Sequence, residues 1–347
     1  MLPHIGVEFQ PVGVAKVPSK GEDGVYCMAT CVSPSETNMI VTTSEKEILL
    51  FDFPTLRPSR KFVGHNGPVG GAGFFRGDAE NMIFSVGGEG DASVKLWDMR
   101  QQNEVSTLRG SDAELFSADI NADNTVVAAG GMENIYCWDI TAMKLLRKYE
   151  EGHCDDVVQT KFHPTNSQLL CTASMDGLIC RADISIAEDM DAFDTILPTD
   201  ISVSRIGLFG PNEDFLYCVS TNETLTLWNL DTAALLVDTG DTRQAVKTAT
   251  GLEAEYLIDC YFDASAEGLL MMVGTSEGAA AMVDVQTSGM VGRASLYSGH
   301  TDIIRDFAIN TTAGWVTTCG EDSVIALWQA KPPLVDAAAH HNVEEEG

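Results

Sequence analysis

The segment SVGGEGDASVKLWDMR, residues 85–100, holds a turn and a strand in a pattern that recurs along the chain. Residues 88–91 tolerate left-handed backbone or bond to their own main chain, which indicates a tight turn. Residues 93–97 are β-branched and aromatic, and the run is too short for a typical helix. We therefore expect a strand, a turn and a second strand that ends on Trp97-Asp98.

Six other segments repeat this ending at intervals of about 40 to 55 residues, a spacing typical of repeat proteins. The matching pairs are Phe51-Asp52, Trp138-Asp139, Ala182-Asp183, Trp228-Asn229, Val283-Asp284 and Trp328-Gln329. Six residues before each pair lies a predicted turn position. These positions are Glu45, Asp91, Met132, Asp176, Asn222, Glu277 and Asp322, and all but Met132 are Asp, Glu or Asn.

A Gly-His pair precedes three of these endings, at Gly64-His65, Gly152-His153 and Gly299-His300. Gly-His ahead of Trp-Asp at this period resembles the WD40 repeat, and the resemblance covers about residues 20–330. It implies an all-β, seven-bladed β-propeller of four-stranded blades. We expect an N-terminal strand, residues 4–14, to complete the last blade beside Trp328. The long sixth interval predicts a longer loop at residues 238–255.

The resemblance also implies a hydrogen-bonded tetrad of His, Ser or Thr, Asp and Trp that ties the strands of a blade together. Matched by position, the candidates are His65, Asp91 and Trp97 with Glu89 at the hydroxyl position; His153, Ser174 and Asp176 with Ala182 at the Trp position; and His300, Asp322 and Trp328 with Gly320 at the hydroxyl position. No blade is expected to keep all four residues. We interpret the three histidines as structural rather than catalytic or metal-binding.

Charge is the most pronounced feature of the composition, since 51 acidic residues stand against 21 basic ones for a net charge of −30. Such a surface repels phosphate backbones, so direct binding to nucleic acid is not expected. The acidity either keeps the protein in solution, which is the simpler interpretation, or attracts basic proteins. We expect one propeller domain over residues 1–330 and a flexible acidic tail over residues 331–347.

The sequence predicts an intracellular protein of the cytoplasm, the nucleus or both. No apolar run is long enough for a membrane helix, and the first residues predict no secretory signal. The nine cysteines are odd in number and form no C-x-x-C pair, which favours reduced thiols over a disulfide framework. The propeller is expected to be monomeric on its own, or to act as part of a larger assembly.

No motif predicts catalysis, a cofactor or a metal site. Residues 274–278 match G-x-S-x-G, but a strand follows them instead of the helix that a hydrolase needs. His340-His341 would supply only two metal ligands, too few for a defined site. We therefore expect a protein that is not an enzyme.

One short motif points to a specific partner. Asp91-x-x-Val94-Lys95-x-Trp97-Asp98-x-Arg100 resembles the DWD box of WD40 proteins that dock on the DDB-type adaptor of cullin-4 ubiquitin ligases. The resemblance implies that Asp98 and Arg100 contact the adaptor, and a guanidinium with five donors suits such a contact. The alternative is a plain structural repeat, because W-D-x-R also occurs in propellers outside the ligase.

Longer stretches resemble one family within the WD40 proteins. Residues 151–185, EGHCDDVVQTKFHPTNSQLLCTASMDGLICRADIS, are similar to a blade of the WD repeat-containing protein 89 family, and the last two blades are similar as well. The leading hypothesis is a non-enzymatic scaffold for protein–protein interaction, with basic partners or within an assembly. The alternatives are a cullin-4 substrate receptor and an acidic escort for basic ribosomal proteins or histones.

Overall fold

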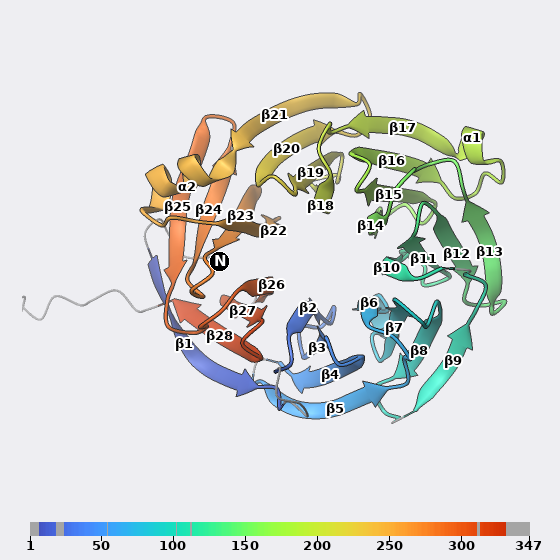
Figure 1. Ribbon diagram of the computed structural model, residues 1–347, viewed down its shortest axis with the longest axis horizontal. Helices are drawn as coiled ribbons and strands as arrows, with labels where there is room; N and C mark the ends of the chain where they lie inside the picture. Colours follow the sequence, from blue (N-terminus) through green and yellow to red (C-terminus); the bar gives the residue numbers. More distant parts are fainter. Residues whose placement is uncertain are drawn as a thin grey trace, which may run out of the picture.

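The computed structural model describes residues 7–18, 24–53, 55–101, 103–111, 113–310 and 313–330. Its strands form sheets arranged radially around a central axis, so that the ribbon closes into a ring (Figure 1). The predicted tail, residues 331–347, lies outside the described residues, as does His340-His341. In the described part, no helix has the length and apolar character needed to cross a membrane.

Most sheets are built from four strands that follow one another in the chain. They contain β2 (Cys27–Val32), β3 (Asn38–Thr43), β4 (Glu47–Asp52) and β5 (Arg57–Val63); β6 (Val69–Phe74), β7 (Met82–Gly87), β8 (Val94–Asp98) and β9 (Glu104–Leu108); β10 (Leu115–Ile120), β11 (Val126–Gly131), β12 (Ile135–Asp139) and β13 (Lys144–Tyr149); β14 (Val157–Phe162), β15 (Leu169–Ser174), β16 (Leu178–Asp183) and β17 (Phe193–Pro198); and β18 (Val203–Phe209), β19 (Phe215–Ser220), β20 (Thr224–Asn229) and β21 (Ala234–Asp241).

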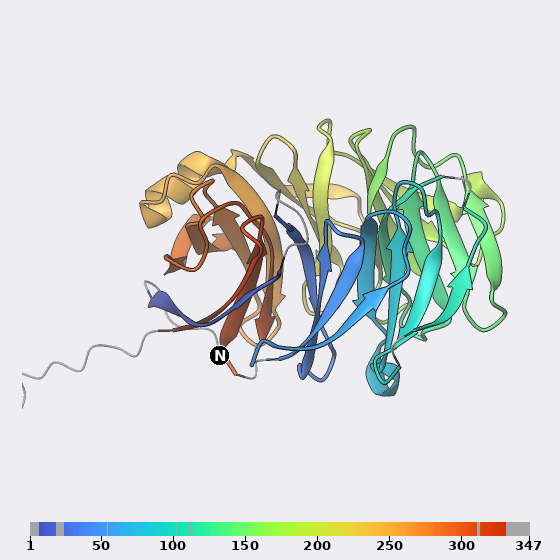
Figure 2. The same cartoon turned by 60° about the horizontal axis from the view of Figure 1, so that its bottom comes forward.

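The remaining strands form one eight-stranded sheet with two four-stranded halves. One half is β22 (Tyr256–Asp263), β23 (Gly268–Gly274), β24 (Ala280–Gln286) and β25 (Gly289–Leu296), and the other is β26 (Ile304–Asn310), β27 (Trp315–Gly320) and β28 (Val324–Ala330) with β1 (Val7–Lys16). Strand β1 joins the halves, because it pairs antiparallel with β28 and parallel with β25. Figure 2 shows blue β1 beside red β28, although they lie at opposite ends of the sequence.

The all-β propeller fold and the N-terminal strand that completes the last sheet are therefore confirmed. The strand was predicted at residues 4–14 and is found at Val7–Lys16, while residues 4–6 lie outside the described part. Its register places Pro11 opposite Trp328, as the expected pairing requires.

The predicted turn positions lie between the second and third strands of their sheets. At each of them the next residue has a positive φ, from 45° to 81°: Lys46, Ala92, Glu133, Gly177, Glu223, Gly278 and Ser323. Only two of these residues are glycine, so in all turns but the one at Met132 the sequence signal was the Asp, Glu or Asn before the residue with positive φ.

The core consists of side chains between neighbouring sheets. Trp97, Trp138 and Trp328 are 0% exposed and Trp228 is 6% exposed, and each lies on the third strand of its sheet. One cluster joins Leu96 of β8 to Tyr136 of the next sheet. Since removal of a buried Trp side chain costs about 3–5 kcal/mol, each sheet depends on its neighbours for stability.

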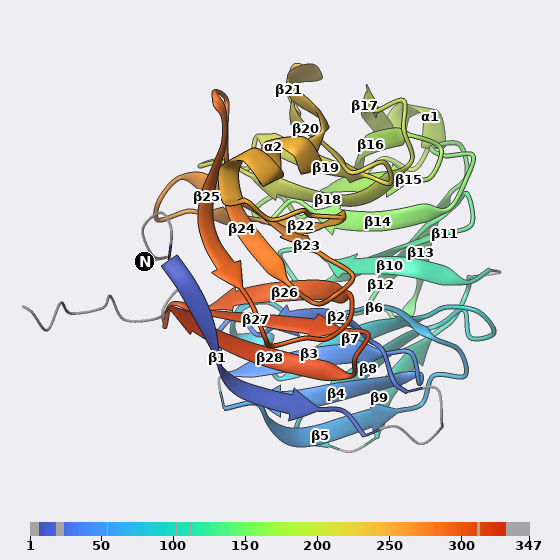
Figure 3. The ribbon, with the colours of Figure 1, turned by 60° about the vertical axis from the view of Figure 1, so that its left-hand side comes forward.

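The long sixth interval contains a helix where the sequence predicted only a loop. Helix α2 (Thr242–Thr250) begins at Asp241, whose carboxylate accepts a hydrogen bond from the Arg243 N–H, and ends at Gly251 with a φ of 79°. Val246 is fully buried in a cluster with residues of β24, and Figure 3 shows α2 lying against β25 and β24. Two shorter helices, η1 (Gly77–Ala79) and α1 (Asp189–Ala192), lie in connections.

Candidate functional site

In the β6–β9 sheet a complete hydrogen-bonded tetrad surrounds Ser85. The His65 Nδ1 atom lies 2.6 Å from the Asp91 carboxylate, and its Nε2 atom lies 2.6 Å from Ser85 Oγ. Ser85 Oγ also accepts a hydrogen bond of 2.8 Å from Trp97 Nε1. His65, Asp91 and Trp97 are thus brought together, but the hydroxyl comes from Ser85 and the prediction that Glu89 takes its place is wrong.

The half-sheet with β26–β28 has the same arrangement around Thr318. Its Oγ1 atom lies 2.7 Å from His300 Nε2 and accepts a 2.7 Å hydrogen bond from Trp328 Nε1. His300 Nδ1 lies 3.1 Å from the Asp322 carboxylate. The prediction of Gly320 at the hydroxyl position is wrong here, and so is the expectation that no blade keeps all four residues.

The β14–β17 sheet keeps three of the four residues. His153 lies 3.1 Å from the Asp176 carboxylate and 2.9 Å from Thr172 Oγ1. Ser174, the predicted hydroxyl, instead donates to the Asp155 carbonyl oxygen and accepts from the Asp176 N–H. The prediction that Ser174 bonds to the histidine is therefore wrong.

The register of the strands explains these errors. Ile83 and Val316 pair directly with the tryptophans Trp97 and Trp328, and the hydroxyl residue lies two positions further along the same strand. Residues two apart share one face of a strand, so an indole that leans along the sheet reaches that hydroxyl. The prediction placed the hydroxyl two residues before the turn Asp, whereas it lies four residues before Asp176 and Asp322 and six before Asp91.

Burial affects the charge of the tetrad around Ser85. Burial lowers the pKa of His65, against the opposing effect of its hydrogen bond to Asp91. The pKa of Asp91 is also lowered, because hydrogen bonds from Ser93, Asn66 and His65 outweigh the opposing effect of burial. A neutral imidazole therefore donates to a carboxylate, which ties a loop to a turn and leaves no reactive group free.

Asp98 and Arg100 lie at the end of β8 and form a local ion pair. The Arg100 guanidinium donates to both Asp98 oxygens, with Nε to Oδ1 at 2.9 Å and NH2 to Oδ2 at 2.7 Å. The bonds from Arg100 lower the pKa of Asp98 to about 2. The Arg100 side chain is 71% exposed and that of Asp98 only 7%, so Asp98 orients a guanidinium that remains accessible.

The central channel is lined by the first strand of every sheet, counting β22 and β26 as first strands of their halves. Each of these strands has a register shift after its first paired residue, or after the second in β22, which indicates a β-bulge. The residues that follow the bulge are therefore equivalent around the channel. They are Ala29, Gly71, Ser117, Gln159, Arg205, Asp259 and Asp306.

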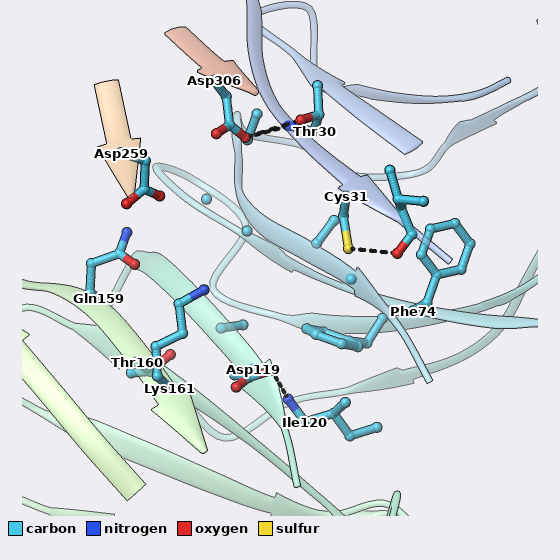
Figure 4. A pocket seen from close by; sticks show the side chains of 18 of the residues that line it. Thr30, Cys31, Phe74, Asp119, Ile120, Gln159, Thr160, Lys161, Asp259 and Asp306 are labelled. Atoms are coloured by element: carbon cyan, nitrogen blue, oxygen red, sulfur yellow. Dashed lines mark hydrogen bonds between the residues drawn. The ribbon is translucent and has the colours of Figure 1, made fainter. Parts of the chain in front are cut away.

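All of these residues except Ser117 line a cavity of about 410 Å³ together with Asp119 and Lys161 (Figure 4). Burial raises the pKa of Asp306, and Arg205 acts in the opposite direction. Asp306 accepts a 2.7 Å hydrogen bond from the Thr30 N–H, and Asp259 accepts one of 2.9 Å from the Tyr217 hydroxyl. In the channel, the Arg205 guanidinium therefore lies among the carboxylates of Asp259 and Asp306, which already accept hydrogen bonds from other groups.

The residues that line the channel were not predicted from the sequence. Among the residues that the structure describes, no three His, Cys, Asp or Glu side chains are grouped closely enough to hold a metal ion. Ser276, in the G-x-S-x-G match, lies in the turn between β23 and β24, and its hydroxyl donates to Glu255 at 3.1 Å.

A second surface lies at the end of the ring that carries the Gly-His pairs, which we call the Gly-His face. Here the turns between second and third strands meet the connections between sheets, for example through the hydrogen bond from the Met175 N–H to the Asp156 carbonyl. Glu133, Asp155 and Asp156 form the acidic patch of this face. Burial and the charges of Asp155 and Glu133 raise the pKa of Asp156. No Lys or Arg occurs in residues 132–134 or 150–156 to neutralise the patch.

Comparison with known proteins finds two WD repeats in the chain and similarity to WD repeat proteins. The family model described as "WD domain, G-beta repeat" matches residues 143–180 and 293–329. The chain is 27% identical to WD repeat-containing protein 89 homolog of Dictyostelium discoideum over 95% of this chain and 89% of the relative. It is 28% identical to WD repeat-containing protein GTS1 of Arabidopsis thaliana over 85% and 78% of the two chains.

A more distant relative is histone acetyltransferase type B subunit 2 of Candida glabrata, 23% identical over 76% of this chain and 64% of the relative. The predicted resemblance to WD40 repeats and to the WD repeat-containing protein 89 family is confirmed by these matches. WD repeat relatives support, in general, a role as a scaffold for protein–protein interaction.

Proposed function

We propose that this protein is a non-enzymatic scaffold of the cytoplasm or nucleus that binds basic segments of partner proteins through the acidic patch. The observation that carries the proposal is the grouping of Glu133, Asp155 and Asp156 on the Gly-His face, where burial and then the charges of Asp155 and Glu133 raise the pKa of Asp156. Like charges held this close repel one another, so a lysine or arginine side chain placed among them relieves the repulsion. The patch is thus better suited to a cationic partner than scattered surface carboxylates are.

The backbone around the patch is held in place before any partner binds. Asp176 accepts hydrogen bonds from His153 and from the Cys154 N–H, and Ser174 donates to the Asp155 carbonyl oxygen. A surface that is already ordered loses less conformational entropy on binding. The net charge of −30 adds long-range attraction for basic proteins. A basic partner is also in keeping with the relative named as a histone acetyltransferase subunit, since histones are basic.

The test is titration of the full chain with a fluorescein-labelled polylysine decapeptide, followed by fluorescence anisotropy at two salt concentrations. The triple variant Glu133→Gln, Asp155→Asn, Asp156→Asn is expected to weaken binding about tenfold at low salt. Binding should weaken at high salt as well, because exposed charges are screened over roughly 8 Å at physiological ionic strength.

A matched control changes the net charge equally on the opposite face. Asp123→Asn, Glu213→Gln, Asp214→Asn alters turns between first and second strands, at the other end of the ring. This control should bind polylysine almost as well as the natural sequence. Equal loss in both triple variants would show that net charge alone attracts the peptide, and the acidic patch would lose its assigned role.

Docking on the DDB-type adaptor is a second candidate function, and the exposed Arg100 guanidinium held by Asp98 favours it. Arg100→Ala should abolish co-purification with the adaptor while the protein stays folded and thermal stability falls only slightly. Arg147→Ala serves as a control, because Arg147 lies on the outer strand of another sheet. Co-purification that survives Arg100→Ala, or that is absent with the natural sequence, rules out this function.

An escort role for ribosomal proteins or histones would use the same acidic patch. It adds the requirement that the protein keep a basic client soluble. Turbidity of a purified histone at low salt, measured with and without the chain, tests this requirement. Clearing by the natural sequence but not by the triple patch variant supports the escort role, and equal turbidity throughout excludes it.

A further inference from the structure

A groove runs along the seam where the ring closes, and we call it the seam groove. Its walls come from the end of β1 and from β4 and β5, which lie side by side in Figure 3. Val14 and Lys16 line one side, and Leu49, Phe51, Arg60 and Lys61 line the other. The volume is about 600 Å³, which lies within the range of protein binding sites. It lies on the outside of the ring, far in the fold from the channel-lining strands.

The lining of the seam groove is mainly apolar. Phe51 belongs to the buried cluster between the two sheets, and Leu49 packs against that cluster. Val14, by contrast, is 58% exposed although it lies next to this cluster. An exposed valine beside buried aromatic and aliphatic side chains indicates apolar surface that a partner can cover.

The charges of the seam groove are opposite to those of the protein as a whole. Lys16, Arg60 and Lys61 line the groove, and among the described residues no Asp or Glu does. Lys61 pairs with Glu47 at 2.8 Å, whereas Lys16 and Arg60 form no ion pair within the described residues. The chain has 51 acidic residues and 21 basic ones, so the charge of the described groove lining has the opposite sign to the net charge of the protein.

We propose that the seam groove binds an extended segment of a partner protein that alternates acidic and apolar side chains. The apolar residues would cover Val14 and Leu49 beside the buried Phe51, and the carboxylates would pair with Lys16 and Arg60. Because side chains alternate between the two sides of an extended chain, one segment can place its apolar side chains against Val14 and Leu49 and its carboxylates against Lys16 and Arg60. This surface is separate from the acidic patch, so the scaffold would hold two partners of opposite charge.

The experiment measures anisotropy of a fluorescein-labelled decapeptide of alternating leucine and aspartate with the full chain. Lys16→Glu should weaken binding at least about fivefold, whereas Lys144→Glu, the same change on an exposed lysine of β13, should not. Val14→Asp should weaken binding similarly. Its control is Val12→Asp on the same strand, since Val12 is 47% exposed but does not line the seam groove.

Two control peptides and one deletion variant test which segment binds in the seam groove. A peptide of alternating serine and aspartate should bind weakly, and one of alternating leucine and lysine should bind at the acidic patch if at all. No binding of the leucine–aspartate peptide at about 1 mM, or equal binding by Lys16→Glu and Lys144→Glu, overturns the proposal. If deletion of residues 331–347 raises peptide affinity tenfold, this chain's own acidic segment is the occupant and the partner proposal is wrong. Failure here leaves the polylysine result unaffected, because that test uses different residues.

Discussion

Two adjacent threonines of β27 offer a sharp test of the tetrads. Thr317 and Thr318 are both 0% exposed. The Thr318 hydroxyl lies 2.7 Å from His300 Nε2 and from Trp328 Nε1. The Thr317 hydroxyl has no hydrogen-bond partner within the described residues. The same substitution, Thr to Val, therefore removes a shared hydrogen-bonding group at one position and an unsatisfied one at the other.

The magnitudes follow from the cost of leaving buried polar groups unpaired. Thr318→Val leaves His300 Nε2 and the Trp328 N–H without a partner, at about 1–3 kcal/mol each. The free energy of unfolding should therefore fall by about 2–6 kcal/mol. Thr317→Val replaces an unpaired buried hydroxyl by a methyl group, so the free energy of unfolding should stay the same or rise by about 1 kcal/mol.

Thr318→Ser separates the hydroxyl from the volume of the side chain. It keeps both hydrogen bonds and removes one methyl group, for an expected loss of about 1 kcal/mol. The assay is equilibrium urea denaturation followed by circular dichroism and tryptophan fluorescence, with midpoints compared at equal slope. If Thr318→Val is as stable as Thr318→Ser, or if the two valine variants are alike, the tetrad does not carry the stability assigned to it.

Three further outcomes are expected. Because burial lowers the pKa of His65 in the folded state, the unfolded chain takes up a proton first as the pH falls, and the free energy of unfolding should decrease below about pH 6.5. Urea titrations at pH 7.5 and 5.5 should show a smaller decrease for His65→Asn than for the natural sequence. An equal decrease in both proteins would contradict this prediction. Deletion of residues 1–16 removes β1, including the buried Phe9, whose side chain alone contributes about 3–5 kcal/mol to the free energy of unfolding. Limited proteolysis should therefore cleave the deletion variant much faster than the control variant Val12→Ser. Equal rates of cleavage would argue against ring closure by β1. Arg100→Ala should raise the pKa of Asp98 from about 2 toward 3.8 in a carboxyl NMR titration and lower the melting temperature slightly, and an unmoved pKa would mean that Arg100 is not its main partner.

The fold could be predicted from the sequence because each sheet of the propeller repeats the same short pattern of turn and strand residues. Trp97, Trp138, Trp228 and Trp328 each lie on the third strand of a sheet, and every predicted turn position precedes a residue with positive φ. Turn chemistry and strand composition act over few residues, so they can be recognised without knowledge of the packing. Helix α2 also had local signals, an Asp at its start and a Gly at its end, which the loop prediction overlooked.

The tetrad hydroxyls and the channel depend instead on pairing between strands. Thr172 and Ser174 point to the same face of β15, and only the position of His153 decides which one it contacts. The bulge in each first strand shifts the alternation by one residue, so Arg205, Asp259 and Asp306 could not be aligned by counting. Polar residues inside apolar first strands were the one available signal.

The structural tetrads and the proposed binding surface share the same hydrogen bonds. The Asp176 carboxylate that accepts from His153 also accepts from the Cys154 N–H, and Ser174 holds the Asp155 carbonyl. The connection that carries Asp155 and Asp156 is thus fixed by groups that stabilise the β14–β17 sheet. Carboxylates on a free loop would move apart to relieve their repulsion, whereas these stay close enough to raise the pKa of Asp156. The loss of the tetrad Trp at Ala182 leaves this anchor intact, which explains how a degenerate repeat can still present a charged surface.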